Sequence, residues 1–214
     1  MNKSSANIIR EYGPLPDVDH VHGVSYDGRN VWIAGGDKLL AVDPENGGTV
    51  RVLDVACHAG TAFDGKHLFQ IAENRIDKID PDTGRVLATI PAPGDGADSG
   101  LAWAEGALWV GQYRERKIHQ IDPHTGKILR TINSNRFVTG VTWVDGELWH
   151  GTWEGDESEV RRIDPATGDV LEQIELPLGV NVSGLESDGG ERFFCGGGGS
   201  GKLRAVERPR RKGR

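Results

Sequence analysis

Short runs of alternating apolar and polar residues follow one another along most of the chain, separated by turns rich in Gly, Asp and Pro. Residues 31–33 (VWI) and 128–132 (ILRTI) are typical of these runs. A period of two residues indicates β-strands, and no stretch shows the period of 3.6 residues expected of an amphipathic helix. The pattern therefore predicts an all-β protein made of short strands.

The strands recur in a unit of about 40 residues, a length typical of propeller blades. Each unit opens with a glycine, and these glycines are 37 to 44 residues apart: Gly23, Gly60, Gly100, Gly140 and Gly184. A tight Asp-Gly or Glu-Gly turn follows the first strand of every unit, because Gly accepts the positive φ of such hairpins. Four of the units also end their third strand with Asp-Pro, at residues 43–44, 80–81, 122–123 and 164–165.

Each unit is expected to form four antiparallel strands, which predicts a five-bladed β-propeller. The last unit lacks a fourth strand, and a spare strand at residues 7–12 precedes the first unit. Pairing the two would close the ring and remove an exposed sheet edge. The expected blades are residues 18–55, 56–91, 96–133, 137–176, and 180–207 together with 6–12, all in one domain of residues 1–207.

Composition and charge limit the classes of partner. The net charge is −7 and no basic groove with interleaved aromatic residues is present, so no nucleic-acid partner is expected. Basic residues gather in residues 208–214, which we expect to be a disordered tail. No apolar run resembles a signal peptide or a membrane span. We therefore expect a cytoplasmic protein with no membrane contact and two free thiols, and the oligomeric state stays open.

The loops that differ between units are expected to lie on one face of the propeller, opposite the regular turns. Variable loops on a rigid scaffold are where sites are usually built. The residues that precede the opening glycines enter the central channel on that face: Val21-His22, His58-Ala59, Asp98-Ser99, Val138-Thr139 and Val182-Ser183. This arrangement predicts a site for one small polar molecule at the mouth of the channel.

His22 and His58 are the predicted catalytic residues, because imidazole can act as a general acid or base near neutral pH. Together with His20 they are also a candidate site for a divalent metal, since alternate residues of a strand share a face. His150 is a further candidate ligand. The alternative is that these imidazoles hydrogen-bond to the backbone at the channel mouth, and the sequence does not decide whether a metal is bound.

Eight further residues of this face are predicted to bind the substrate: Cys57, Glu73, Tyr113, Arg114, Arg136, Trp153, Asn181 and Cys195. Tyr113 and the two arginines would stabilise an oxyanion, with solvated loop charge as the alternative for each arginine. Trp153 belongs to a longer acidic loop, which is either a lid or an exposed loop with one anchoring Trp. The cysteines are either nucleophiles beside a histidine or small apolar core residues.

The repeated motifs small-Gly-apolar, Asp-Gly-x-x-Leu-Trp and Ile-Asp-Pro-x-Thr-Gly-x-Val-Leu resemble those of the glutamine cyclotransferase family, over residues 7–206. The resemblance implies a five-bladed propeller. In glutaminyl cyclases of this type, Gln-Gly-Leu opens the first blade and Gly-Glu-Gly-Leu, with a catalytic Glu, opens the second. The chain has residues 22–24 (HGV) and 58–61 (HAGT) there, so Ala59 stands at the position of the acid. An Asn-Glu-Leu-Glu-Trp motif of a later blade corresponds to residues 138–143 (VTGVTW).

A second pattern, in residues 21–24 (VHGV) and 31–35 (VWIAG), resembles the repeats of streptogramin B lyases, with Gly35 at the position of a Glu. The residues and both resemblances together predict an enzyme that acts on a small molecule by histidine acid/base chemistry. The reaction would be that of a lyase, of an acyltransferase-like cyclotransferase, or of a ring-opening enzyme. A metal would assist it if one is bound. The alternative is a propeller without catalysis that binds a ligand or peptide on the same face.

Overall fold

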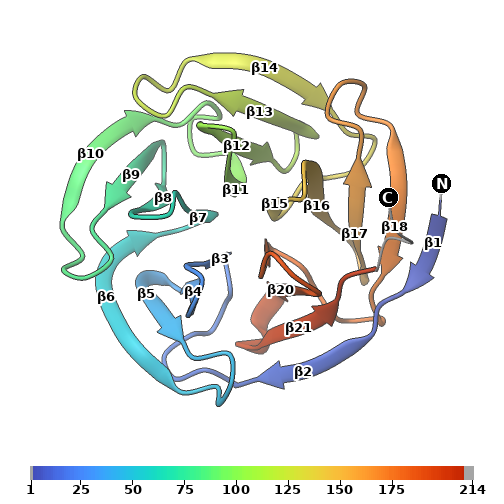
Figure 1. Cartoon of the computed structure of the whole chain (residues 1–214), viewed down its shortest axis with the longest axis horizontal. Coiled ribbons are helices and arrows are strands. Elements are labelled where there is room, and N and C mark those ends of the chain that lie inside the picture. The colour runs from blue at the N-terminus through green and yellow to red at the C-terminus, as the bar shows by residue number, and fades with distance from the viewer. Residues whose placement is uncertain (1, 210–214) are drawn as a thin grey trace.

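The computed structural model describes residues 2–209, which form five β-sheets arranged as blades around a central axis (Figure 1). Blade 1 consists of β3 (Gly23–Tyr26), β4 (Val31–Ala34), β5 (Gly36–Val42) and β6 (Thr49–Cys57). Blade 2 consists of β7 (Thr61–Phe63), β8 (Leu68–Ala72), β9 (Arg75–Ile79) and β10 (Val86–Pro91). Blade 3 consists of β11 (Asp98–Ala104), β12 (Ala107–Gln112), β13 (Lys117–Ile121) and β14 (Ile128–Asn133).

Blades 4 and 5 complete the ring and contain the N-terminal strands. Blade 4 consists of β15 (Val141–Val144), β16 (Glu147–Glu154), β17 (Glu157–Ile163) and β18 (Val170–Glu175), with β1 (Asn2–Ser5) at its outer edge. Blade 5 consists of β19 (Gly184–Ser187), β20 (Arg192–Gly196), β21 (Leu203–Glu207) and β2 (Ile8–Tyr12). The prediction of an all-β, five-bladed propeller is confirmed. The described residues contain no helix long and apolar enough to span a membrane.

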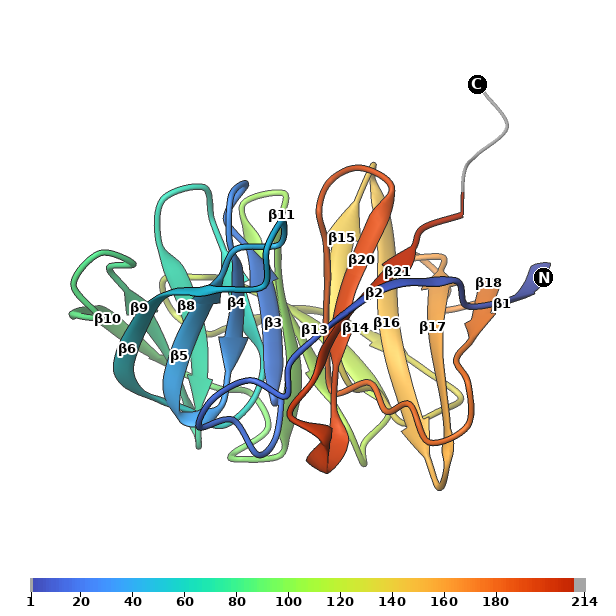
Figure 2. The same cartoon turned by 90° about the horizontal axis from the view of Figure 1, so that it is seen from below.

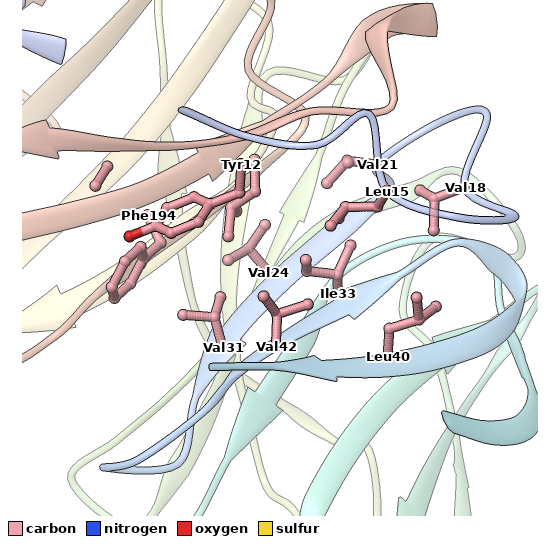
Figure 3. Packing of buried hydrophobic residues seen from close by; sticks show 12 residues of the cluster. Tyr12, Leu15, Val18, Val21, Val24, Val31, Ile33, Leu40, Val42 and Phe194 are labelled. Atoms are coloured by element: carbon pink, nitrogen blue, oxygen red, sulfur yellow. The ribbon is translucent and has the colours of Figure 1, made fainter. Parts of the chain in front are cut away.

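The N-terminal strand closes the last blade as predicted. β2 pairs antiparallel with β21, so that Tyr12 lies opposite Leu203. Tyr12 and the segment that follows it pack against blade 1, where Leu15 and Val18 lie beside Ile33 and other buried residues (Figure 3). The Tyr12 hydroxyl also donates a hydrogen bond of 2.8 Å to the Pro44 carbonyl of blade 1. The closing strand therefore holds blade 5 to blade 1 as well as completing blade 5.

A second N-terminal strand, β1, was not predicted. It pairs in parallel with β18, and all four of its residues (NKSS) are exposed, so no apolar pattern marks it in the sequence. β1 and β2 together run along the outer edges of blades 4 and 5 at the rim of the disc (Figures 1 and 2). Of the predicted basic tail, Arg208 is ion-paired with Asp145 at 2.6 Å, and residues 210–214 lie outside the described residues.

Aromatic residues pack neighbouring blades together. The second strand of every blade carries a buried aromatic residue at the same position: Trp32, Phe69, Trp109, Trp149 and Phe194. An aromatic residue from the first strand of the next blade covers several of these, as Trp143 does for Trp109 at 5.1 Å between ring centroids. Stacked aromatic pairs contribute about 1 kcal/mol beyond the area they bury. Most of the tryptophans are therefore packing residues.

The five opening glycines mark the places where neighbouring blades approach most closely. A β-carbon on Gly100 would lie 2.2 Å from the Thr139 carbonyl oxygen, and one on Gly60 would lie 2.3 Å from the Leu101 nitrogen. The same contact closes the circle, since a β-carbon on Gly184 would lie 2.6 Å from the Val24 nitrogen. We name these five residues the glycine ring: Gly23, Gly60, Gly100, Gly140 and Gly184. Residues that precede them lie on its mouth side, and residues that follow them lie on its far side.

Candidate functional site

A pocket of about 310 Å³ lies on the mouth side of the glycine ring. Nine residues line it: His22, His58, Ala59, Asp98, Ser99, Tyr113, Thr139, Trp153 and Ser183. The residue that directly precedes each ring glycine is among them, so all five blades contribute. The pocket therefore brings together four of the predicted site residues, namely His22, His58, Tyr113 and Trp153.

Larger hollows lie on the opposite face, among the regular turns. One of about 680 Å³ includes Arg51 and Asp82, which form an ion pair of 2.6 Å with each other. Another of about 380 Å³ includes Asp145 and Arg208, which are also paired at 2.6 Å. The charged groups named here bind one another, so these hollows offer less for a ligand than the channel-mouth pocket does.

His22 is the partly buried imidazole of the pocket. Its backbone N–H donates to the Ala34 carbonyl at 2.9 Å, which fixes the residue directly before β3. Burial lowers the pKa of His22 below its usual value, and the neighbouring His20 and His58 lower it further. Neither ring nitrogen of His22 forms a hydrogen bond within residues 2–209. The imidazole is therefore neutral at pH 7 and free to accept a proton.

The other two histidines at the mouth are exposed. His58 lines the rim of the pocket, and its backbone N–H donates to the Ile71 carbonyl at 3.2 Å. The His20 ring centroid lies 6.0 Å from that of His22, outside the pocket lining. In the described part of the chain, no three His, Cys, Asp or Glu side chains are grouped so that they could hold a metal ion. The predicted metal set of His20, His22 and His58 is therefore not assembled.

His150, Cys57 and Cys195 lie inside the blades, away from the pocket. His150 is fully buried in β16, its Nδ1 is 2.9 Å from the Gly151 carbonyl oxygen, and burial lowers its pKa to about 4. Burial raises the pKa of Cys195 to about 12 and also raises the pKa of Cys57, whose thiol donates to the Lys38 carbonyl at 3.0 Å. We therefore assign all three to the core, in place of the predicted roles as metal ligand and substrate-binding residues.

Four other predicted substrate-binding residues also do not line the pocket. Arg136 pairs with Glu154 at 3.1 Å and lies 3.7 and 3.9 Å from two further carboxylates. Arg114 and Glu73 are exposed in turns between second and third strands. Asn181 packs under the glycine-rich turn, where a β-carbon on Gly198 would lie 2.6 Å from its Nδ2. Their position in variable loops was predicted correctly, but loop position does not fix the direction of a side chain.

Tyr113 and Trp153 form an aromatic wall on the side of blades 3 and 4. The Tyr113 hydroxyl donates to the Trp153 carbonyl at 2.8 Å, and the Trp153 Nε1–H donates to the Gly155 carbonyl at 2.8 Å. The centroid of the Tyr113 ring lies 4.6 Å from that of the Phe137 ring. Burial raises the pKa of Tyr113, so this hydroxyl stays protonated. Because the hydroxyl proton is already donated to Trp153, the Tyr113 oxygen can only accept a hydrogen bond from a ligand. Stabilising an oxyanion, the predicted role of Tyr113, would need a free donor.

Asp98 is a pocket residue that the sequence analysis placed at the channel mouth without giving it a role. It is the first residue of β11 and is 8% exposed. Its carboxylate accepts hydrogen bonds from the Gly94 N–H at 2.9 Å and from the Gln112 amide at 3.3 Å. The sequence contained a signal for this site. Asp98 is an acid two residues before the ring glycine Gly100, and it follows a loop that contains Gly94 and Gly96.

Glu186, on the far side of the glycine ring, is an acid that the sequence analysis did not name. The Thr142 hydroxyl donates to Glu186 Oε1, the Ser187 N–H donates to the same oxygen at 2.9 Å, and the Ser25 hydroxyl lies 3.5 Å from Oε2. Burial raises the pKa of Glu186 to about 7. The sequence contained a signal for Glu186 as well. The residue two positions after the ring glycine is Glu only in blade 5 and is small in the other four blades: Ser25, Ala62, Ala102 and Thr142.

No protein-family model matches the chain, and no curated protein matches its sequence. Among solved structures, Myxococcus xanthus glutaminyl cyclase is similar with a TM-score of 0.80 and 18% identity, over 96% of this chain and 97% of that chain. Staphylococcus aureus virginiamycin B lyase has a TM-score of 0.52 and 16% identity, over 94% of this chain and 70% of that chain. The WD40 propeller domain of Doa1 has a TM-score of 0.56 and 16% identity, over 88% and 64%. The chain therefore has the five-bladed propeller fold that glutaminyl cyclase also has.

Proposed function

We propose that the protein binds a small polar molecule in the channel-mouth pocket and transforms it by histidine acid/base chemistry. The observation that carries this proposal is His22, a partly buried imidazole with a lowered pKa and no hydrogen-bonding partner in residues 2–209. A neutral imidazole inside a pocket can take a proton from a bound molecule. His58 at the rim is the second imidazole and the candidate for returning the proton.

The reaction class in this proposal is an elimination, a cyclisation or a ring opening, each of which needs a proton removed and a proton returned. The names of two structural neighbours, a glutaminyl cyclase and a virginiamycin B lyase, support that range. We include a cytoplasmic location in the proposal, because both cysteines are free thiols, as is usual in a reducing compartment.

The second candidate is a propeller that binds a ligand without transforming it. Ala59 favours it, because this pocket residue stands where the family resemblance places a catalytic acid. The two candidates share the pocket and differ only in whether His22 moves a proton.

Comparison of His22→Gln with wild type tests the proposal. Purified protein is incubated with pooled small polar metabolites, and consumed compounds are detected by mass spectrometry. We expect wild type to consume a compound and His22→Gln to be slower by about 10² or more at an unchanged melting temperature. His124→Gln, which alters an exposed histidine in a regular turn, is the matched control and should keep full activity.

The pH dependence of that turnover has a defined sign. Because burial lowers the pKa of His22, this base becomes protonated at a more acidic pH than an ordinary histidine does. Turnover should therefore fall as the pH is lowered, and the fall should begin at a more acidic pH than an ordinary histidine would give. A compound that binds without being consumed, with equal affinity for wild type and His22→Gln, would contradict catalysis and favour the second candidate.

A further inference from the structure

The buried acids of this protein differ in how their charge is compensated. Four acidic residues are buried among those described: Asp77, Asp98, Glu147 and Glu159. Three of them form ion pairs with arginines, in the pairs Asp77–Arg75 (3.1 Å), Glu147–Arg162 (3.4 Å) and Glu159–Arg161 (2.6 Å). Among these four, only Asp98 has no Lys, Arg or His partner within residues 2–209. The partly buried Glu186 has none either, but hydroxyl groups of the two neighbouring blades hold its carboxyl group. A buried carboxylate without a cation is costly, so the position of Asp98 in the pocket needs a cause.

The surroundings of Asp98 are built to hold a carboxylate. The Gly94 N–H donates to one oxygen and the Gln112 amide donates to the other, and neither donor carries a charge. A β-carbon on Gly94 would lie 2.6 Å from Asp98 Oδ1, so the loop closes around the acid only with glycine there. The pairing of β11 with β12 is irregular between Asp98 and Leu101, and such a bulge changes the direction of a side chain.

The rest of the pocket lining contains no permanently charged cation. None of the nine residues that line it is Lys or Arg, and the nearby Arg136 is engaged by carboxylates. Burial and the neighbouring imidazoles lower the pKa of His22, which keeps it neutral at pH 7. The same pocket is lined by Tyr113 and Trp153, whose rings attract cations. A bound anion would meet an uncompensated carboxylate, whereas a bound cation would complete an ion pair.

We propose that the pocket selects molecules that carry a protonated amine, and that Asp98 is the residue that binds the ammonium group. This inference rests on the proposed use of the channel-mouth pocket, but it does not depend on catalysis by His22. The wall and the carboxylate together would hold the amine, and His22 would face another part of the bound molecule. An ammonium group would also favour the ionised form of Asp98, whose pKa burial raises in the free protein.

Three probes of one shape and different charge test this proposal: benzylamine, benzyl alcohol and benzoate. Their affinities for the full chain are measured by ligand-observed NMR at pH 7. We expect benzylamine to bind at least about 10-fold more tightly than the other two, as one charge-assisted hydrogen bond allows. Asp98→Asn keeps the shape and removes the charge, so it should bind benzylamine about 10-fold more weakly and benzyl alcohol unchanged.

Asp95→Asn is the matched control, because Asp95 is exposed in the same loop and its φ of 47° suits Asn. It should bind all three probes as wild type does. Equal affinity of wild type for the amine and the alcohol, or a preference for benzoate, would overturn the charge selection even if Asp98→Asn failed to fold. Binding of none of the probes would instead overturn the use of this pocket. The charge preference is measured as binding without turnover, which separates this proposal from the catalytic one.

Discussion

Two carboxyl groups without a cationic partner, one on each side of the glycine ring, show how the same chemical group takes different roles in this propeller. Asp98 lies on the mouth side and Glu186 on the far side, and burial raises the pKa of both. Neither is ion-paired within the described residues. The difference is in their hydrogen-bond donors. Asp98 is held from within its own blade and its loop, whereas Glu186 is bound by Thr142 of blade 4 and lies close to Ser25 of blade 1.

The blades that supply the hydrogen-bond donors distinguish Glu186, which has a structural role, from Asp98, which we propose to bind a ligand. Because Glu186 contacts the blades on both sides of it, its carboxyl group joins three inner strands beside the seam where the ring closes. Asp98 makes no such connection and lines the pocket instead. Changes on the far side should therefore alter stability, and changes on the mouth side should alter binding.

The largest effect on stability is expected from Gly100→Ala, which alters the glycine ring between the mouth side and the far side. The new β-carbon would lie 2.2 Å from the Thr139 carbonyl oxygen and 2.6 Å from the Val141 nitrogen. Both atoms belong to the backbone of blade 4, so the two blades would have to separate. We expect the free energy of unfolding to fall by roughly 3 kcal/mol or more, measured by denaturant titration.

Gly190→Ala is the control for that experiment, since the nearest atom to its β-carbon would be 3.4 Å away. It should change stability by less than about 0.5 kcal/mol. A Gly100→Ala protein as stable as this control would show that the glycine ring is not the tight contact between blades.

The next effect is expected from Glu186→Gln and depends on pH. The pKa of Glu186 is about 7 in the folded protein and 4.5 in an ordinary setting, so its contribution to stability is complete below pH 4.5 and is lost as pH rises to about 7. Gln cannot ionise and avoids this loss. Above pH 7 the variant should be more stable than wild type by roughly 2–3 kcal/mol, in denaturant titrations repeated between pH 4 and pH 9.

The measurement at pH 4 serves as an internal control, because Glu186 is then protonated in both the folded and the unfolded protein. The two proteins should have similar stability there, apart from any difference between an amide and a protonated carboxyl group. A variant that is less stable than wild type at pH 8 would mean that the ionised carboxylate is well compensated in the channel.

The fold was largely predictable from the sequence, because the spaced glycines and the Asp-Gly or Glu-Gly turns recur in every blade. The closing strand β2 was predictable since the last unit visibly lacks a strand. β1 was not, because its four exposed polar residues pair through their backbone alone. Backbone pairing of this kind leaves no pattern in the side chains.

The site was predictable only in part. Position beside a ring glycine places a side chain at the pocket, and this rule found His22 and His58. It also applied to Asp98, whose importance depends on the absence of a cationic neighbour, which a sequence does not show. The neighbours of Arg136 were equally hidden in the sequence, so its predicted role in substrate binding missed its ion pairs. Its carboxylate partners come from the β16–β17 hairpin, and their distances depend on how the loops fold.

The smallest effect on stability is expected from Arg136→Ala, on the mouth side. Arg136 and the Phe137 N–H both bind Glu154, which follows Trp153 in the aromatic wall. Loss of the arginine should lower the free energy of unfolding by about 1 kcal/mol, since the Arg136–Glu154 pair is partly exposed. Hydrogen exchange of residues 153–157 should become faster, and benzylamine should bind a few-fold more weakly.

Lys117→Ala is the matched control for the aromatic wall, because Lys117 forms an exposed ion pair of 3.4 Å with Glu115 on the neighbouring hairpin. It should leave both the exchange of residues 153–157 and the binding of benzylamine unchanged. If Arg136→Ala behaves like this control, the wall is held by the Tyr113 hydroxyl and the Trp153 Nε1–H alone. If instead benzylamine binds more tightly while exchange stays slow, Arg136 acts on the ligand through its charge, which has the same sign as that of the proposed ligand. A weaker affinity together with faster exchange identifies a positioning role.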